Sequence, residues 1–241
     1  MAEKEPKEMS FIEHLEELRK RIIRCLIFIL VFSIAAYFFS DRIIDFIARP
    51  VEQLFFMDPT EAFAIRIKMS IIVGIILSVP VIFYHLWQFV VPGLFVKEIK
   101  LVIPVVISST IFFLIGACFC FFLVLPLGIK FLLGFGTEKL SPMIKISSYV
   151  SFVSYMTLAF GAVFELPVIS YFLGRIGLIG PQTLVKGRKY AIVGILILAS
   201  FLTPPDLFSQ IMLAGPLYIL YEVSIVVLKV TQKKKKDEEF S

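Results

Sequence analysis

Several runs of the sequence are apolar, uncharged and too long for the core of a small soluble domain. The clearest are residues 101–125 and 207–221. A bilayer core about 30 Å thick takes roughly 20 apolar residues in helical conformation, and a helix hydrogen-bonds its own backbone groups within lipid. The whole chain is 59% hydrophobic and 18% charged, whereas a soluble domain carries about 25% charged residues. The sequence therefore predicts an all-α integral membrane protein.

The apolar runs predict six transmembrane helices in a single domain over residues 10–230. Their expected ranges are 22–39, 69–90, 101–125, 148–173, 190–202 and 207–228. The last two helices are expected to be short, since the 13 residues of 190–202 cover only about 20 Å. Pro126 is expected to end the third span. We expect residues 1–9 to be disordered and residues 231–241 to form a charged cytoplasmic tail.

Lysine and arginine are distributed unevenly among the segments that connect these helices. With the N-terminus in the cytoplasm, the cytoplasmic segments hold 17 of the 24 basic residues and the outer segments hold 7. Basic residues next to membrane spans accumulate on the cytoplasmic side. The sequence therefore predicts that both termini are cytoplasmic.

The sequence lacks the common signatures of enzymes. It has no His-Glu-x-x-His segment, no Gly-x-Ser-x-Gly segment and no phosphate-binding loop. His14 and His85 lie in different segments, without a cysteine or acidic cluster at metal-ligand spacing. We therefore expect a protein that is not an enzyme and that uses no cofactor, no metal and no nucleic acid.

Two acidic residues fall within the predicted spans. Glu165 lies about eight residues from the inner end of the fourth span, at a depth of roughly 12 Å, and Glu222 lies in the sixth span, nearer the inner surface. An acid at the centre of a membrane helix costs about 2.5–3.5 kcal/mol on insertion scales, so it should face protein or water and is a candidate for function. The alternative for Glu165 is a protonated side chain that only hydrogen-bonds a neighbour. Pro167 adds local polarity, because the carbonyl of Val163 loses its helical donor.

Glu17 and Glu98 are acids on the cytoplasmic side, each beside the end of a span. Each has a simple explanation as a solvated surface residue. Glu17 can pair with Arg21 at i, i+4 spacing, which stabilises a helix by only about 0.2–0.5 kcal/mol. Glu98 lies between Lys97 and Lys100. Taken alone, neither position indicates a site.

Several segments together resemble the TatC family, the multi-spanning receptor subunits of the twin-arginine translocase. The segments are SFIEHLEELRKR (10–21), FVVPGL (89–94) with Lys97-Glu98, FGAVFELP (160–167), TPPD (203–206) and LYE (220–222). They occur in order over about residues 10–230. Together they are specific, although each alone is a weak signal. One departure is Gly93, where the family usually has alanine.

The resemblance implies a receptor for signal peptides that carry two consecutive arginines. In the family, the acid of the first segment and the acid of the first inner loop form the recognition site, and these positions are Glu17 and Glu98 here. The signal-peptide site that the resemblance implies consists of His14, Glu17, Arg19, Phe89 and Glu98. Intramembrane polar contacts with partners are expected from Glu165, Asp206, Gln210 and Glu222. Pro50 is expected to shape a loop.

The chemistry of arginine agrees with this implication. A guanidinium group fits a carboxylate with two parallel hydrogen bonds, whereas a lysine ammonium does not. Two acids at the inner surface can therefore distinguish an Arg-Arg pair from a Lys-Lys pair. Exposed ion pairs contribute only about 0–1 kcal/mol each, so the apolar part of the signal peptide must add affinity by lying along the helices.

The resemblance also implies a location and partners. The location is the bacterial cytoplasmic membrane, which the chain crosses several times. The partners are single-span subunits of the TatA and TatB type and membrane lipid, in an oligomeric complex that exports folded proteins with the proton-motive force. Glu165 is then expected to lie in a concave groove that opens toward the cytoplasm.

The alternative function is proton-coupled transport of a small solute, with Glu165 and Glu222 as a proton relay. Such transporters often contain inverted repeats. The predicted halves of this chain do not match, because span five is much shorter than span two and span one has no acid that corresponds to Glu165.

Overall fold

The computed structural model describes residues 11–51, 54–90, 102–134, 143–202 and 207–239 of the chain. The segment 1–9 that was expected to be disordered lies outside the described residues, and so do Glu98 and Asp206.

The described part of the chain is helical and contains no β-strand, apart from one isolated bridge between Phe55 and Lys145. This confirms the predicted all-α class. The helices are α1 (Phe11–Tyr37), α2 (Ser40–Ala48), α3 (Pro59–Val90), α4 (Val102–Phe119), a π-helical turn (Cys120–Val124), α5 (Leu125–Leu133), α6 (Ile146–Val163), α7 (Leu166–Arg175), α8 (Pro181–Leu202) and α9 (Leu207–Glu239).

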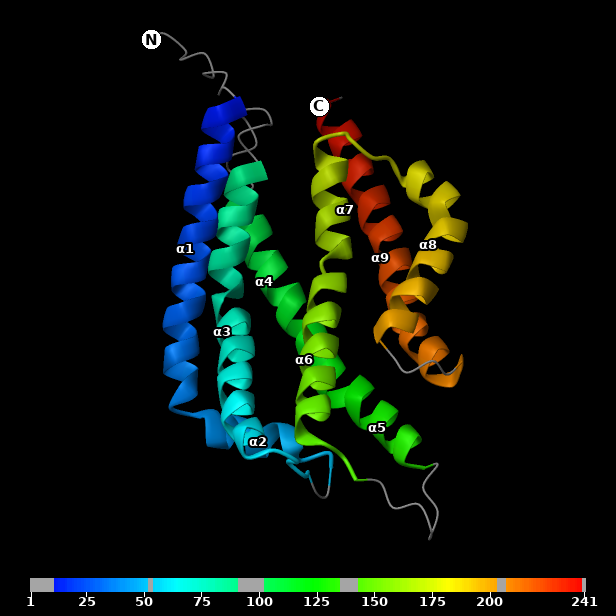
Figure 1. Cartoon of the computed structure of the whole chain (residues 1–241). Helices are drawn as coiled ribbons and strands as arrows, with labels where there is room; N and C mark the ends of the chain where they lie inside the picture. The colour runs from blue at the N-terminus through cyan, green and yellow to red at the C-terminus, as the bar shows by residue number, and fades with distance from the viewer. Residues whose placement is uncertain (1–10, 52–53, 91–101, 135–142, 203–206, 240–241) are drawn as a thin grey trace.

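The long helices lie side by side in a bundle (Figure 1). α1 packs along α3, α4 packs against both α3 and α6, and α9 packs against both α7 and α8. The short helix α2 turns by 80° from α1. The first turn of α1 and the last turn of α9 lie at the same end of the bundle (Figure 1). We call this the Glu17 end, after the residue in the first turns of α1, and we call the other the Glu61 end.

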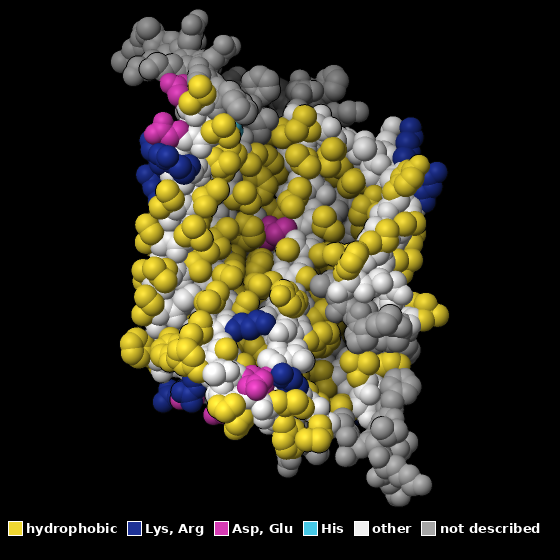
Figure 2. All heavy atoms as spheres, in the orientation of Figure 1, with side chains coloured by type: hydrophobic (Ala, Val, Ile, Leu, Met, Phe, Trp, Pro, Cys, Tyr) yellow, Lys and Arg dark blue, Asp and Glu magenta, His cyan; other side chains and the backbone are white. Residues whose placement is uncertain are grey.

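Four helical segments are long and apolar enough to cross a membrane, and the bent pair of α1 and α2 makes a fifth. The four are Pro59–Val90, Val102–Leu133, Ile146–Arg175 and Leu213–Gln232. α8 is not among them, because Lys186, Arg188 and Lys189 lie within it. Hydrophobic side chains cover the middle of the face in Figure 2, as lipid contact requires. The chain is thus a helical membrane protein, whereas the count of six spans and the cytoplasmic side of the termini stay predictions.

The third helical segment continues past Pro126, which corrects the expectation that this proline ends it. α4 passes into the π-helical turn, where the backbone N–H of Leu125 bonds to the carbonyl of Cys120, and α5 follows with Pro126 in its first turn. A proline is tolerated in the first turn of a helix, where its missing N–H leaves no bond unmade. The wider π turn interrupts the ordinary helical ladder at this point, so the chain bends without ending the span.

The fifth and sixth helices are longer than the short helices predicted from their apolar parts. α8 has 22 residues and begins at Pro181, nine positions before the predicted range 190–202. Proline favours the first helical turn. α9 has 33 residues and includes the described part of the predicted tail 231–241, since lysine and glutamate are good helix formers.

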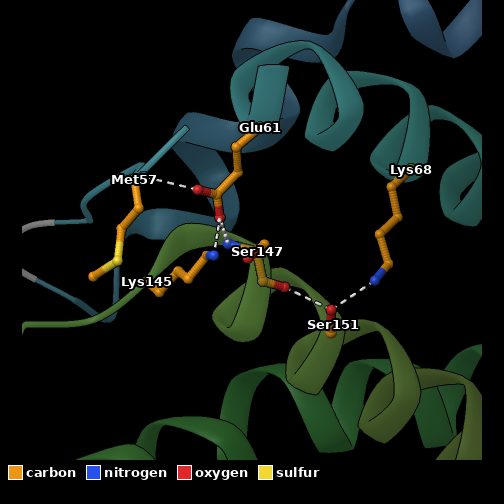
Figure 3. Close-up of polar contacts among 6 residues, drawn as sticks. All are labelled: Met57, Glu61, Lys68, Lys145, Ser147 and Ser151. Carbon is orange, nitrogen blue, oxygen red and sulfur yellow. Dashed lines mark hydrogen bonds and ion pairs between the residues drawn. The ribbon is translucent and has the colours of Figure 1, made fainter. Parts of the chain in front are cut away.

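Glu61 joins separate segments at the Glu61 end of the bundle (Figure 3). Its Oε2 accepts a hydrogen bond from the backbone N–H of Met57 at 2.8 Å, and its Oε1 accepts one from the backbone N–H of Ser147 at 3.2 Å. The Nζ of Lys145 lies 3.8 Å from the same Oε1. One buried carboxylate therefore fixes the start of α3 against the start of α6.

A glycine allows α1 and α3 to approach closely, and this contact sets the register of the pair. A Cβ on Gly74 of α3 would lie 2.8 Å from the backbone nitrogen and 2.9 Å from the Cα of Ser33 on α1. Both residues are buried. Small residues at such crossings are typical of membrane helices, because backbones can then pack directly.

We expect Gly74→Ala to destabilise the protein by about 1–3 kcal/mol, the usual cost of overpacking a tight contact. The matched control is Gly194→Ala in α8, where an added Cβ meets no atom within 4 Å. That change should be neutral or slightly stabilising, since alanine is the better helix former. Thermal unfolding of both variants in one detergent measures the difference. Equal midpoints would show that the close α1–α3 contact is not needed.

Candidate functional site

The predicted pairing of Glu17 with Arg21 is present, and it extends to α3. The Nε of Arg21 donates to Glu17 Oε1 at 3.0 Å, and Nη2 donates to the same oxygen. Nη1 donates to the Oε1 of Gln88 on α3 at 2.7 Å. The Arg21 side chain is only 10% exposed and that of Glu17 is 24% exposed. The guanidinium group therefore links the two helices at the Glu17 end.

The second oxygen of Glu17, Oε2, is buried and has no hydrogen-bond partner among the described residues. An ionised carboxylate can accept about four hydrogen bonds and can bind an arginine through both oxygens. Glu17 thus keeps an unused acceptor beside an oxygen that is already occupied.

His14 and Phe89, two further residues of the expected site, lie in contact. Their rings are stacked with centroids 4.3 Å apart and an angle of 18° between the planes. His14 is on α1, one turn before Glu17, and Phe89 is next to Gln88 in the last turn of α3. Because α1 and α3 pack together over their length, residues far apart in sequence meet here. The structure therefore brings together His14, Glu17 and Phe89.

The structure describes one of the two remaining expected residues of this site, Arg19, which is exposed. Glu98 lies outside the described residues. Gln88 is the member that sequence reasoning missed. Its only signal is its position beside Phe89, as a polar residue at the end of an apolar helix.

Glu165 lies at the break between α6 and α7. The last turn of α6 closes at Phe164, and Pro167 occupies the first turn of α7. A proline cannot donate to the carbonyl four residues earlier, so the helix breaks there, whereas the sequence predicted one continuous span over 148–173. The side chain of Glu165 is only 5% exposed. The residue lies inside the candidate span Ile146–Arg175.

Neither carboxyl oxygen of Glu165 has a hydrogen-bond partner among the described residues. Ser109 of α4 faces this carboxyl. The Ser109 hydroxyl accepts a hydrogen bond from Trp87 Nε1 at 3.1 Å, and its own O–H can still donate to Glu165. The simple alternative for Glu165, a protonated acid that only hydrogen-bonds a neighbour, therefore stays a prediction. A buried polar group without partners costs stability, which makes this position the stronger candidate for function.

Glu222 differs, because both of its oxygens are occupied. Oε2 accepts from Arg188 Nη2 at 2.8 Å, and Oε1 accepts from Tyr218 at 2.9 Å. Gln210 also makes an internal bond, from Nε2 to the carbonyl of Leu196 at 2.9 Å. Both residues thus connect α9 to α8. Both side chains therefore have a structural role within the chain.

Pro50 and the described cavity both lie away from Glu165. Pro50 is half-buried in the turn that follows α2, where the N–H of Val51 bonds to the carbonyl of Ala48 at 2.9 Å. A cavity of about 480 Å³ lies between α2, α3, α4 and α6, and Glu165 is not among its lining residues. The concave groove around Glu165 stays a prediction.

We expect Glu165→Leu to raise the stability of the isolated protein by about 1–3 kcal/mol, because it removes a buried carboxyl without partners. The matched control is Glu222→Leu, which leaves Arg188 without its carboxylate and should lower stability. Thermal unfolding in detergent measures both. A lower midpoint for Glu165→Leu would mean that this carboxyl has a stabilising partner.

The chain is similar to one protein family, to known proteins and to solved structures. The family model for TatC, Sec-independent protein translocase protein, matches residues 13–216. A Sec-independent protein translocase protein TatC from Desulforapulum autotrophicum is 43% identical over 98% of this chain and 90% of its own length. One from Escherichia coli is 38% identical over 89% of this chain and 86% of its own length. A crystal structure of the twin arginine translocase receptor TatC superposes with a TM-score of 0.82 at 38% identity, covering 91% of this chain and all of that one. The chain therefore belongs to the TatC family of Sec-independent protein translocase proteins.

Proposed function

We propose that this chain is the receptor subunit of a twin-arginine translocase and that it binds the signal peptides of exported proteins. Its relatives are named as translocase proteins, and the structure that it resembles is named as the translocase receptor. The family is not one of enzymes, so the activity to be explained is binding and assembly.

The observation that supports this proposal best is the carboxylate of Glu17. It is partly buried, it lies at the end of the α1–α3 pair, and it keeps one oxygen without a donor. A guanidinium group offers several N–H donors in a fixed plane, so it matches a carboxylate better than a lysine ammonium does. We propose that Glu17 accepts an arginine of the signal peptide.

The neighbours of Glu17 complete the proposed site. The stacked rings of His14 and Phe89 form an aromatic surface one turn away, which suits an apolar or cationic side chain next to the arginine pair. We propose Glu98 as the acid for the second arginine and Arg19 as a charge that disfavours cationic peptides in general. The apolar part of the signal peptide would lie along the hydrophobic face shown in Figure 2.

We propose that Glu165 forms a contact with a partner helix or with the signal peptide inside the membrane. Its unpartnered carboxyl supports this role, since a buried acid is retained at a cost only where something uses it. Asp206 and Pro50 remain proposed functional positions. Glu222 and Gln210, which bond within the chain, are better explained as links between α8 and α9.

The proposed setting is the bacterial cytoplasmic membrane, with the Glu17 end in the cytoplasm. We propose that single-span subunits of the TatA and TatB type assemble with this chain into an oligomeric complex, and that the proton-motive force drives export of folded cargo. A single bundle of this size has no room for a folded protein, so further subunits are required.

The alternative of a small-solute transporter is not supported. Its proposed relay needs Glu222 as a proton carrier, but Arg188 and Tyr218 occupy that carboxylate. The relatives that match nearly the whole chain are named as protein translocases.

We expect Glu17→Gln to weaken binding of a twin-arginine signal peptide by about tenfold, as loss of a charged hydrogen bond of roughly 1.5–3 kcal/mol implies. Binding of the same peptide with two lysines should change much less, so the preference for arginine falls. The measurement is titration of both fluorescent peptides into full-length protein in lipid nanodiscs.

The control is Glu16→Gln, which removes an equal charge one residue away. Glu16 is exposed and pairs with Lys20 at 3.0 Å, so this variant should keep the arginine preference. If Glu17→Gln and Glu16→Gln behave alike, Glu17 is not the receptor acid.

A further inference from the structure

The proposed receptor acid is already bound to an arginine of its own chain. Arg21 donates both Nε and Nη2 to one oxygen of Glu17, and the other oxygen is buried. An arginine from outside can therefore reach the unused oxygen only when Arg21 moves aside. In the present state an internal residue occupies the position that we propose for an arginine of the signal peptide.

Arg21 also has a hydrogen-bond partner that it can keep when it releases Glu17. Its Nη1 donates to Gln88 Oε1 at 2.7 Å, and this bond does not involve Glu17. Gln88 is on α3, so the bond holds the guanidinium group beside the α1–α3 contact whether or not Glu17 is released. The exchange of one arginine for another at Glu17 thus does not leave Arg21 without a hydrogen-bond partner.

We propose that Arg21 is an internal competitor that keeps Glu17 closed, and that the arginine pair of a signal peptide opens the site by replacing it. This inference rests on the proposed function. An incoming guanidinium can replace both N–H bonds that Arg21 gives up, so the exchange is nearly balanced. A lysine ammonium cannot reproduce the planar pair of donors, so the same exchange is unfavourable. Arg21 in this way lowers the affinity for every cationic guest, so only a guest that binds the carboxylate strongly, such as an arginine pair, opens the site.

The expected loss of affinity depends on the fraction of molecules in which Glu17 is open. If Glu17 is open only in a fraction of molecules, the apparent affinity for any guest is reduced by that fraction. Removal of Arg21 eliminates this reduction for every guest. The arginine peptide and the lysine peptide then gain affinity by the same factor.

The test compares Arg21→Gln with Lys20→Gln in full-length protein in nanodiscs, using the twin-arginine signal peptide and its Lys-Lys version as probes. Both variants remove one positive charge from the same turn of α1, but Lys20 pairs with the exposed Glu16. We expect Arg21→Gln to strengthen binding of both peptides by about fivefold or more, the lower end of usual coupling between sites, with the ratio of the two affinities unchanged. Lys20→Gln should change both affinities much less.

A second variant, Arg21→Lys, keeps the inference testable if Arg21→Gln does not fold. Arg21→Lys keeps a cation beside Gln88 and Glu17 but cannot donate the same planar pair, so we expect a smaller gain in affinity. Thermal unfolding in detergent checks that each variant is folded. If folded Arg21→Gln and Arg21→Lys bind both peptides no more tightly than the wild type, Arg21 is only a structural link and the inference is wrong.

Glu17→Gln separates this outcome from failure of the proposed function. If Glu17→Gln keeps the full arginine preference, the receptor assignment itself fails. If Glu17→Gln loses the preference, Arg21→Gln in that background should cause no gain in affinity, because Arg21 acts through Glu17. A full gain in the double variant would show that Arg21 acts by another route, which also overturns the inference.

Discussion

The antiparallel contact between α1 and α3 is the interaction on which the candidate site depends. Gly74 lets the two backbones meet at Ser33, and Arg21 bridges to Gln88 several turns away. Between lipid-facing helices there is no hydrophobic driving force, so direct packing and hydrogen bonds determine how they associate. With this register set, the first turns of α1 and the last turns of α3 lie together, and His14 meets Phe89.

Three acids in this fold differ in how far their hydrogen-bonding capacity is used. Glu222 is bonded through both oxygens and joins α8 to α9. Within the described part of the chain, Glu17 is bonded through one oxygen and Glu165 through neither. A buried polar group without partners is costly, so the unused acceptors are better indicators of function than position in a span. By this measure Glu165 and Glu17 are the stronger candidates for function and Glu222 is the weaker one. From the sequence alone, Glu165 and Glu222 were both candidates, because both are acids within predicted spans.

The sequence by itself determined the features that depend on local geometry. Long uncharged runs predicted a helical membrane protein, because in lipid the backbone N–H and C=O groups must be hydrogen-bonded within the protein and a helix bonds its own. The i, i+4 spacing predicted the pair of Glu17 and Arg21, whereas the break that Pro167 causes beside Glu165 was not predicted. Each predicted feature follows from residues close together in the sequence. Helix ends were less predictable, because Pro126 could end a helix or begin one, and a π turn decided between them.

Only the tertiary structure decided which distant residues meet and which polar groups are already in use. Nothing in the spacing of residues 21 and 88 indicates that Arg21 bonds to Gln88, and nothing in the sequence shows that Glu222 is occupied while Glu165 is not. The physical reason is that such contacts depend on how whole helices pack, and packing is set by shape across the interface rather than by any single segment. The sequence therefore identified the acids, and the packing of the helices determined which of them remain available to bind.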